Sequence, residues 1–306
     1  MPTGTIKKST GSWYEILSDD FKVIPARVKG KLRLTNLETT NPVAVGDHVE
    51  YHIEEKEGIA AIDSVLQRQN YIIRKANNLS HQSHIIAANL NQLLVFATVA
   101  MPRTSYGFID RLLLTAEAYE IPAIIFFNKV DICTPEQIEM LNKANEIYTL
   151  AGYKVLSGSV LQNKISFLQS LLYHQTTLIS GHSGTGKSSL INALRPILEL
   201  KTGIISAASQ KGKHTTTFAE MHVIDEETFI IDTPGIKDFG VVDMKKEEIS
   251  HYFPEMRKLL GMCQFNNCLH INEPGCAVLK AIENGEISPE RYESYLSILR
   301  NDDNRH

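Results

Sequence analysis

The sequence predicts a multidomain α/β protein with an N-terminal OB-like β-barrel, a central parallel sheet covered by helices and a C-terminal helical module. Three observations favour this architecture. Short strand-like runs broken by turn residues occupy roughly residues 1–70. From residue 91 apolar strand-like runs alternate with helix-like segments, which is typical of a parallel sheet. Three of the four cysteines gather in 263–276. We therefore place domain boundaries at 1–70, 71–240 and 241–306.

Composition and charge exclude several classes of protein. The chain has 306 residues, of which 43% are hydrophobic and 22% charged, as in ordinary globular proteins. No stretch approaches the ~18 apolar residues of a membrane span, and the N-terminus lacks the apolar core of a signal peptide. A net charge of −4 means that any nucleic-acid surface must be local. We expect a cytoplasmic protein that does not bind membranes.

The predicted barrel contains the strand-like runs SWYEIL, FKVIPARVKGKLRL, VGDHVEYHI and IAAIDSVL. Within the second run four cations alternate with apolar residues, and the period of two puts them on one face of a strand. A solvated strand face and an RNA-binding face both remain open, since four like charges repel unless a polyanion is present. The four cations are Arg27, Lys29, Lys31 and Arg33. The polar stretch that follows, 70–90, is expected to be a connector.

The central part alternates strands and helices. Apolar runs QLLVFATVA, PAIIFFNKVD, YKVLSGS and TTLISG predict strands. Helices are expected near 108–120, 135–151 and 163–174. Thr134 followed by Pro135 predicts the start of the second helix, with the threonine as its N-cap.

A phosphate-binding loop lies between the last of these strands and the helix-prone run SSLINAL. Gly181, Gly186, Lys187 and Ser188 match the pattern G-x-x-x-x-G-K-[ST]. Glycines let backbone N–H groups converge on phosphate oxygens, the lysine reaches the outer phosphates, and the serine hydroxyl holds Mg²⁺. We assign the whole loop to nucleotide binding: Gly181, His182, Ser183, Gly184, Thr185, Gly186, Lys187, Ser188 and Ser189.

A second motif, NKVD, indicates that the nucleotide is guanine. Asn128, Lys129, Val130 and Asp131 follow an apolar strand, at the sheet edge where open α/β proteins bind ligands. A carboxylate there accepts two hydrogen bonds from guanine that adenine cannot donate. Taken alone, the tetrapeptide is also compatible with an ordinary polar loop. The next strand ends at Ser157 and Gly158, which are weaker candidates for contacts with the base.

Two further segments fit a response to the γ-phosphate. The stretch 211–217, KGKHTTT, offers a threonine to the metal shell, and we take Thr217 as the candidate without excluding the other two. In DTPG, Asp232 fits an outer contact to Mg²⁺ and Gly235 can offer its N–H. NKVD precedes the phosphate loop here, whereas it follows that loop in the common GTPase order. The sequence therefore predicts a circularly permuted GTPase domain whose γ-phosphate segments lead into the C-terminal part.

The clustered cysteines predict a zinc site. Cys263, Cys268, His270 and Cys276 form C-x4-C-x-H-x5-C, and three thiols with one imidazole suit a closed, structural tetrahedral site. Helices expected at 245–260, 277–284 and 288–300 would make a module too thin to be stable without the metal.

Together these motifs resemble the RsgA-type family of circularly permuted, small-ribosomal-subunit-dependent GTPases over essentially the whole chain. The resemblance implies a GTP hydrolase that acts late in 30S ribosomal subunit biogenesis, binds the subunit near 16S rRNA, and cycles between GTP and GDP. It also implies that the barrel and the zinc module face the ribosome. We expect a monomer.

One departure concerns the hydrolytic water. Many GTPases place a glutamine directly after the DxxG glycine, but Ile236 stands here and cannot form a hydrogen bond through its side chain. Unaided hydrolysis should therefore be slow, and His214 is the candidate for positioning the water, although it could equally contact RNA. Two alternatives remain open: a GTP-regulated RNA-binding module with incidental hydrolysis, and a phosphate-loop ATPase or kinase that uses the zinc module on DNA.

Overall fold

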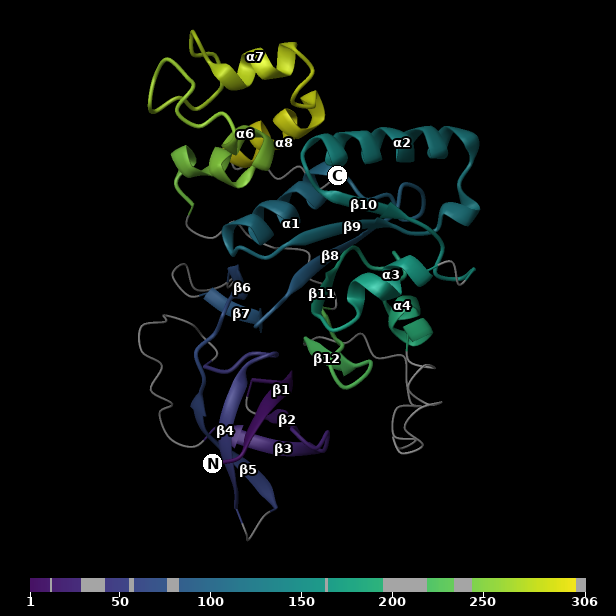
Figure 1. Cartoon of the computed structure of the whole chain (residues 1–306), viewed down its shortest axis with the longest axis vertical. Helices are drawn as coiled ribbons and strands as arrows, with labels where there is room; N and C mark the ends of the chain where they lie inside the picture. Colours follow the sequence, from purple (N-terminus) through teal and green to yellow (C-terminus); the bar gives the residue numbers. More distant parts are fainter. Residues whose placement is uncertain are drawn as a thin grey trace.

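The computed structural model describes residues 1–11, 13–28, 42–54, 58–75, 83–162, 165–194, 219–233 and 244–300. The three expected parts follow one another along the long axis of the molecule, with the barrel at one end and the C-terminal helices at the other (Figure 1). Among the described residues, no helix combines the length and the apolar character needed to cross a membrane.

The N-terminal part is a closed five-stranded barrel, as predicted. Strand β1 pairs with both β2 and β4, β2 pairs with β3, and β5 closes the ring between β3 and β4. Apolar residues alternate along these strands, so that Ile6, Ile16, Val49 and Ile62 fill the interior. The strands are β1 (Thr3–Ser9), β2 (Tyr14–Ser18), β3 (Val23–Val28), β4 (His48–Glu54) and β5 (Ile59–Val65).

The stretch expected to be a connector instead contains an antiparallel strand pair, and that prediction was wrong. Strands β6 (Tyr71–Lys75) and β7 (Ser83–Ala88) pair with each other. The polar composition of 70–90 concealed β-branched residues such as Ile72 and Ile85, which are buried here. The backbone at Gly46 packs directly against β7. Only glycine fits there, because a Cβ on Gly46 would lie 2.2 Å from the carbonyl oxygen of Ala88.

The central part is an open sheet in the strand order β10-β9-β8-β11-β13-β12. All neighbours are parallel except β12, which runs antiparallel to β13. Strand β12 also pairs with β1 of the barrel, so the five barrel strands and these six strands form one 11-stranded sheet, and β6 and β7 form a separate one. The central strands are β8 (Gln92–Ala97), β9 (Ala123–Phe127), β10 (Lys154–Ser157), β11 (Thr176–Ser180), β12 (Glu220–Val223) and β13 (Phe229–Asp232).

Helices cover both faces of this sheet. Along β8, Leu93 and Val95 point into one apolar core while Leu94 and Phe96 point into the other, as expected for a strand buried on both faces. Helix α2 begins at the predicted residue, and the side chains and backbone N–H groups of Thr134 and Gln137 cap it reciprocally. The helices are α1 (Tyr106–Ala118), η1 (Val130–Ile132), α2 (Pro135–Leu150), α3 (Ser166–Leu172) and α4 (Lys187–Leu194).

The C-terminal part is helical, as predicted, but its first element is not one helix. The chain forms the 3-10 helix η2 (Lys246–Tyr252) and then the short helix α6 (Pro254–Arg257). Pro254 explains the break, because it has no N–H for an internal helical hydrogen bond and so begins a new helix. Helices α7 (Ala277–Glu283) and α8 (Pro289–Arg300) complete the module, whose apolar core includes Leu114 of α1.

Candidate nucleotide site and metal centre

The predicted nucleotide motifs meet at one edge of the central sheet. Asn128 follows β9, Gly158 follows β10, Gly181 follows β11, and Thr233 follows β13. Because β9, β8, β11 and β13 are parallel neighbours and β10 flanks β9, these residues lie at the carboxyl ends of adjacent strands. The fold therefore brings together segments that are separated by about a hundred residues in the sequence, from Asn128 to Thr233.

A buried hydrogen bond joins the two motifs directly. The Asn128 side chain donates from Nδ2 to the carbonyl oxygen of Thr185 in the phosphate loop, at 2.8 Å. Its Oδ1 accepts from the backbone N–H of Val160, at 3.0 Å. Both polar atoms of this buried amide side chain are thus hydrogen-bonded, and they link the end of β9 to the loops after β11 and β10. Beside it, the N–H of Val130 donates to the carbonyl oxygen of Gly158, so the β10 end joins the same cluster.

The glycines of the phosphate loop are required by close approach. A Cβ on Gly181 would lie 2.1 Å from the carbonyl oxygen of Phe96 on β8, so no larger residue fits. Gly186 has a φ of +107°, and a Cβ there would lie 2.4 Å from Asn128 Nδ2. Gly181 and Gly186 therefore allow the phosphate loop to pack closely against β8 and the NKVD motif, in addition to any role in phosphate binding.

Lys187 and Asp232 place opposite charges at the base of the loop. The Lys187 ammonium donates to the carbonyl oxygens of Gly181 at 2.6 Å and His182 at 2.9 Å. Burial lowers its pKa, while the nearby Asp232 carboxylate acts in the opposite direction. Burial likewise raises the pKa of Asp232, opposed by Lys187. Asp232 Oδ1 is buried without a hydrogen-bond partner among the described residues, as expected of a carboxylate placed to meet an additional cationic or donor group.

The predicted residues differ in exposure in a way that suits their proposed contacts. Asp131, Ser157 and Ser188 are exposed, whereas Asn128 and Thr185 are buried beneath them. Ser183 and Gly184 are also exposed, at the tip of the loop. The exposed groups are available to a ligand, and the buried ones support the loop.

The sequence reasoning missed the loop after β8, residues 98–105. Its Met101 carbonyl oxygen accepts from Lys129 Nζ at 2.8 Å, and a Cβ on Gly184 would lie 3.6 Å from Pro102. Just beyond it on α1, Phe108 stacks on His182 with ring centroids 3.8 Å apart. Burial lowers the pKa of this histidine, which favours its neutral form. The available signal was the position of the loop, because it follows an apolar strand at the same sheet edge.

A separate cavity of about 240 Å³ lies between α1 and α8. Tyr106, Glu290 and Glu293 are among the residues that line it. Two carboxylates would repel a triphosphate, so this cavity is not the candidate nucleotide site.

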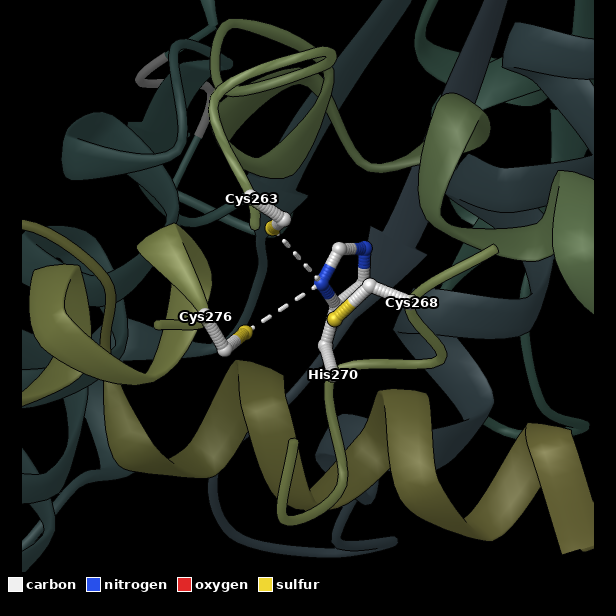
Figure 2. Close-up of side chains that lie close together, drawn as sticks. All are labelled: Cys263, Cys268, His270 and Cys276. Atoms are coloured by element: carbon white, nitrogen blue, oxygen red, sulfur yellow. Dashed lines mark hydrogen bonds between the residues drawn. The ribbon is translucent and has the colours of Figure 1, made fainter. Parts of the chain in front are cut away.

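The predicted metal ligands converge in the C-terminal module (Figure 2). One ligand atom from each of Cys263, Cys268, His270 and Cys276 lies within 4.8 Å of all the others. His270 Nδ1 is 3.6 Å from Cys263 Sγ and 3.4 Å from Cys276 Sγ. Tetrahedral zinc with its usual bond lengths would place sulfur and nitrogen about 3.6 Å apart. The donor set and its spacing therefore fit a single metal ion.

The loop around this cluster is held by specific hydrogen bonds. The Glu273 carboxylate accepts from the backbone N–H groups of Leu269 and Ile271, both at 2.8 Å, and of Asn272 at 3.0 Å. Burial opposes its charge, but these hydrogen bonds lower its pKa to about 2. From α8, Tyr292 and Tyr295 donate to the carbonyl oxygens of His270 and Leu269, at 2.6 and 2.7 Å. These hydrogen bonds hold both sides of the ligand loop without a contribution from a metal ion.

Without a metal ion, burial keeps the ligand thiols protonated and the imidazole neutral. Burial raises the pKa of the Cys268 thiol to about 12 and raises that of Cys276 as well, while burial lowers the pKa of His270. A buried group of thiols resists ionisation unless a cation is present, and coordination supplies that cation. This Cys₃His group can bind a metal ion.

Two family models match most of the chain. A family model described as RsgA GTPase matches residues 65–242, and a second, the RsgA N-terminal domain, matches residues 3–60. The chain belongs to the RsgA GTPase family.

Relatives within the RsgA family are similar over nearly the full chain. A protein from Christiangramia forsetii named small ribosomal subunit biogenesis GTPase RsgA is 48% identical, covering 99% of this chain and 97% of its own length. One of the same name from Bacteroides fragilis is 50% identical, covering 97% of this chain and 96% of its own length.

Two solved RsgA-like structures share the fold. YjeQ from Thermotoga maritima is 30% identical, with a TM-score of 0.77, and the match covers 100% of this chain and 99% of that one. YloQ, described as a circularly permuted GTPase, is 28% identical with a TM-score of 0.71, covering 100% and 96%. The permuted order inferred from NKVD and the phosphate loop is thus the order of the family.

Several predicted RsgA-type residues lie outside the described part of the chain. These are the hydrolytic candidate His214, the candidates Thr217 and Gly235, and the barrel cations Lys29, Lys31 and Arg33. Arg27, the remaining barrel cation, is described, and its guanidinium forms an ion pair with Glu54 at 2.5 Å. Its charge is therefore partly neutralised within the barrel itself.

Proposed function

We propose that this chain hydrolyses GTP as a biogenesis factor of the small ribosomal subunit, the role given in the names of its RsgA relatives. The observation that supports a guanine-nucleotide site most directly is the hydrogen bond from Asn128 to Thr185, because it joins the base motif to the phosphate loop. A phosphate-loop ATPase or kinase would have no need of NKVD at this edge.

The base and the phosphates would be held by different parts of the site. The exposed Asp131 carboxylate accepts the two guanine N–H groups, while Lys129, Val130, Ser157 and Gly158 line the base. The backbone N–H groups of 181–186 and the Lys187 ammonium bind the phosphates. Ser189 lies in the first turn of α4, behind the residue that meets the metal.

Mg²⁺ would enter with the nucleotide. The exposed Ser188 hydroxyl is the proposed direct ligand, with Thr217 as a second and the partly unpaired Asp232 carboxylate behind them. The N–H of Gly235 is proposed to meet the γ-phosphate. Bound Mg²⁺ would neutralise charge on the β- and γ-phosphates, and the residues of the chain fix their positions.

Hydrolysis itself depends on a water-positioning group. Since Ile236 replaces the usual glutamine, we propose that turnover by the free protein is slow and that His214 positions the water once the subunit is bound. The alternative, a GTP-regulated RNA-binding module with incidental hydrolysis, predicts that a His214→Ala protein leaves subunits as readily as wild type after GTP is added. Our proposal predicts that it remains bound.

We further propose that the Cys₃His group holds one structural Zn²⁺, because its four donors form a closed set with no position left for a substrate. The barrel and this module are proposed to contact 16S rRNA, with Arg27, Lys29, Lys31 and Arg33 as the candidate barrel cations. The proposed protein is a cytoplasmic monomer that does not bind membranes. Its proposed domains are 1–70, 71–240 and 241–306.

The experiment that tests the function compares GTP turnover with and without purified small subunits. We expect marked stimulation by subunits, no comparable ATP turnover, and loss of turnover in a Ser188→Ala protein. Ser170, an exposed serine on α3 away from the site, gives the matched control Ser170→Ala. Turnover that is unaffected by subunits, or equal use of ATP, would contradict the proposal.

A further inference from the structure

A row of charged residues crosses the boundary between the barrel and the nucleotide site. Across the paired strands, Glu15 of β2 lies opposite Lys8 of β1, Lys8 lies opposite Glu220 of β12, and Glu220 lies opposite Asp232 of β13. Residues directly opposite in antiparallel strands share a face of the sheet, with Cβ atoms about 5 Å apart. The row therefore runs continuously from the barrel to the carboxylate beside Lys187.

A β-bulge adds a second lysine to this row. The register of β1 against β2 shifts between Ile6 and Lys8, which leaves Lys7 as the extra residue. Lys7 Nζ reaches Glu220 at 3.3 Å and Glu15 at 3.4 Å, and Lys8 Nζ reaches Glu220 at 3.4 Å. Two ammonium groups of the barrel thus converge on one carboxylate of the nucleotide domain.

These charges act on one another because they are partly shielded from solvent. The Glu220 side chain is only 23% exposed. Burial opposes its charge, but Lys7 and Lys8 outweigh burial and lower its pKa. Glu220 in turn contributes, after burial, to the raised pKa of Asp232. Asp232 therefore responds to a charge that the barrel lysines control.

We propose that Glu220 is a positioning residue for the Asp232 end of the nucleotide site. In this proposal Lys7 and Lys8 of the barrel neutralise Glu220, and so the barrel influences the net charge beside Asp232. The inference rests on the proposed function, and it names a route by which RNA on the barrel changes nucleotide binding. The lysine side chains are 19% and 31% exposed, so an RNA phosphate backbone can compete for them. Glu220 then faces Asp232 without its counter-charges.

The same contact is close in sequence to the predicted γ-phosphate segment 211–217. Glu220 follows Thr217, the candidate metal ligand, by three residues in the sequence. Releasing the lysines would weaken the attachment of β12 to β1. Without the lysine charges, Glu220 is uncompensated, and its negative charge disfavours further negative charge near Asp232.

The test uses charge variants of opposite sign in the full-length protein, with the GTP dissociation constant as the readout. Glu220→Gln removes a negative charge opposite Asp232, and we expect about threefold tighter GTP binding, from the Coulomb energy of charges roughly 10 Å apart in a partly shielded setting. The double variant Lys7→Ala with Lys8→Ala uncovers that charge, and we expect about threefold weaker binding. Both effects should shrink as salt is raised.

A matched control lies in the same cluster. Glu15→Gln removes a carboxylate from the same lysine, but on the far side of the row from Asp232, and it should change GTP affinity less than twofold. Glu220→Asp keeps the charge, and the flexible lysines can follow it, so it should restore wild-type affinity. A purely structural role for Glu220 would instead give weaker binding in every variant and no dependence on salt.

The outcomes separate this inference from the function beneath it. Opposite, salt-sensitive shifts in the two variants support the role of Glu220. Wild-type affinity in both, shifts of the same sign, or an equal effect of Glu15→Gln would overturn it while leaving GTP binding by wild type intact. A wild-type protein that fails to bind GTP would overturn both the inference and the proposed function.

Discussion

The two ends of the nucleotide domain are joined to their neighbours by chemically different contacts. At the C-terminal junction Arg291 of α8 lies 1% exposed and donates to Asp110 of α1 at 2.6 Å and to Glu255 of α6 at 2.7 Å. Its guanidinium also lies over the ring of Phe253, 4.5 Å from the centroid. At the barrel junction the ion pairs of Glu220 with Lys7 and Lys8 are longer and partly open to solvent.

Apolar packing also makes the C-terminal junction the more tightly joined of the two. Leu114 of α1 belongs to the core of the C-terminal module, so those two parts share a hydrophobic interior. The barrel has its own apolar cluster, although Val45 packs into the central core. A buried, shared interior cannot be opened without exposing apolar surface and uncompensated charge, whereas partly exposed ion pairs cost less to separate. The C-terminal module is therefore fixed to α1, and the β1–β12 contact is the adjustable one.

Removing the proposed zinc should damage the fixed junction most. Structural zinc contributes about 10 kcal/mol or more to folding in small zinc-binding peptides, and even a fraction of that is large here. Tyr292 and Tyr295, which hold the ligand loop, lie on the same helix as Arg291. We expect Cys276→Ser to abolish stoichiometric zinc and to lower the thermal midpoint sharply. Cys133→Ser, outside the cluster, should retain zinc; equal zinc content in the two variants would refute the assignment.

Arg291→Met should be the next most damaging change. It leaves the buried Asp110 and Glu255 carboxylates without a counter-charge, which costs about 3–5 kcal/mol of unfolding free energy. Urea unfolding followed by circular dichroism would measure the loss. The control is Arg257→Met, since Arg257 is 48% exposed and pairs with Glu117 at the surface. Similar losses in both variants would show that burial does not distinguish the two pairs.

Glu273→Gln should show a smaller effect that depends on pH. The folded-state pKa of Glu273, about 2, lies below its ordinary value of 4.5, so its stabilisation is present above that ordinary value. It is lost as the pH falls from about 4.5 toward 2. We expect the variant to lose about 1–3 kcal/mol at neutral pH and to have a shallower pH dependence in that window. Glu283→Gln, at an exposed glutamate of α7, should match wild type throughout.

The smallest loss of stability is expected at the adjustable junction. Glu220→Gln should lower the unfolding free energy by about 1 kcal/mol or less, because its ion pairs are partly exposed. The single tryptophan, Trp13, lies in the barrel, so its fluorescence reports unfolding there. A loss as large as that of Arg291→Met would mean that the two junctions are equally rigid.

The candidate sites could be predicted from local sequence motifs. The contacts between domains could not, because they join residues that are far apart in the sequence. NKVD and the phosphate loop each follow an apolar strand, and parallel strands end at a common edge, so their convergence could be expected. The Cys₃His cluster was predictable because its spacing is short. By contrast, Arg291 and Asp110 are 181 residues apart, and Lys7 and Glu220 are 213 apart. Such pairs depend on how domains dock, which no local pattern records.

The strands β6 and β7 were missed for a related reason. Their apolar residues, including Ile72 and Ile85, form two short runs that a polar stretch separates, so that 70–90 taken as a whole has a polar composition. The pairing becomes favourable only because the central core covers their apolar face. Phe108 and Pro102 were missed because residues that only pack against the phosphate loop do not form a recognisable sequence motif.

The most direct test of a guanine-nucleotide site at this sheet edge is competition between nucleotides for the protein and its Asp131→Asn variant. We expect GTP, but not a hundredfold excess of ATP, to displace labelled GTP from wild type, because polar sites discriminate by about 10⁴-fold or more. Asp131→Asn should lose this preference and gain affinity for xanthosine triphosphate, whose 2-carbonyl accepts from the new amide. Glu139→Gln, at an exposed glutamate on α2, should behave as wild type. Equal displacement by ATP, or undiminished GTP selectivity in Asp131→Asn, would contradict the account.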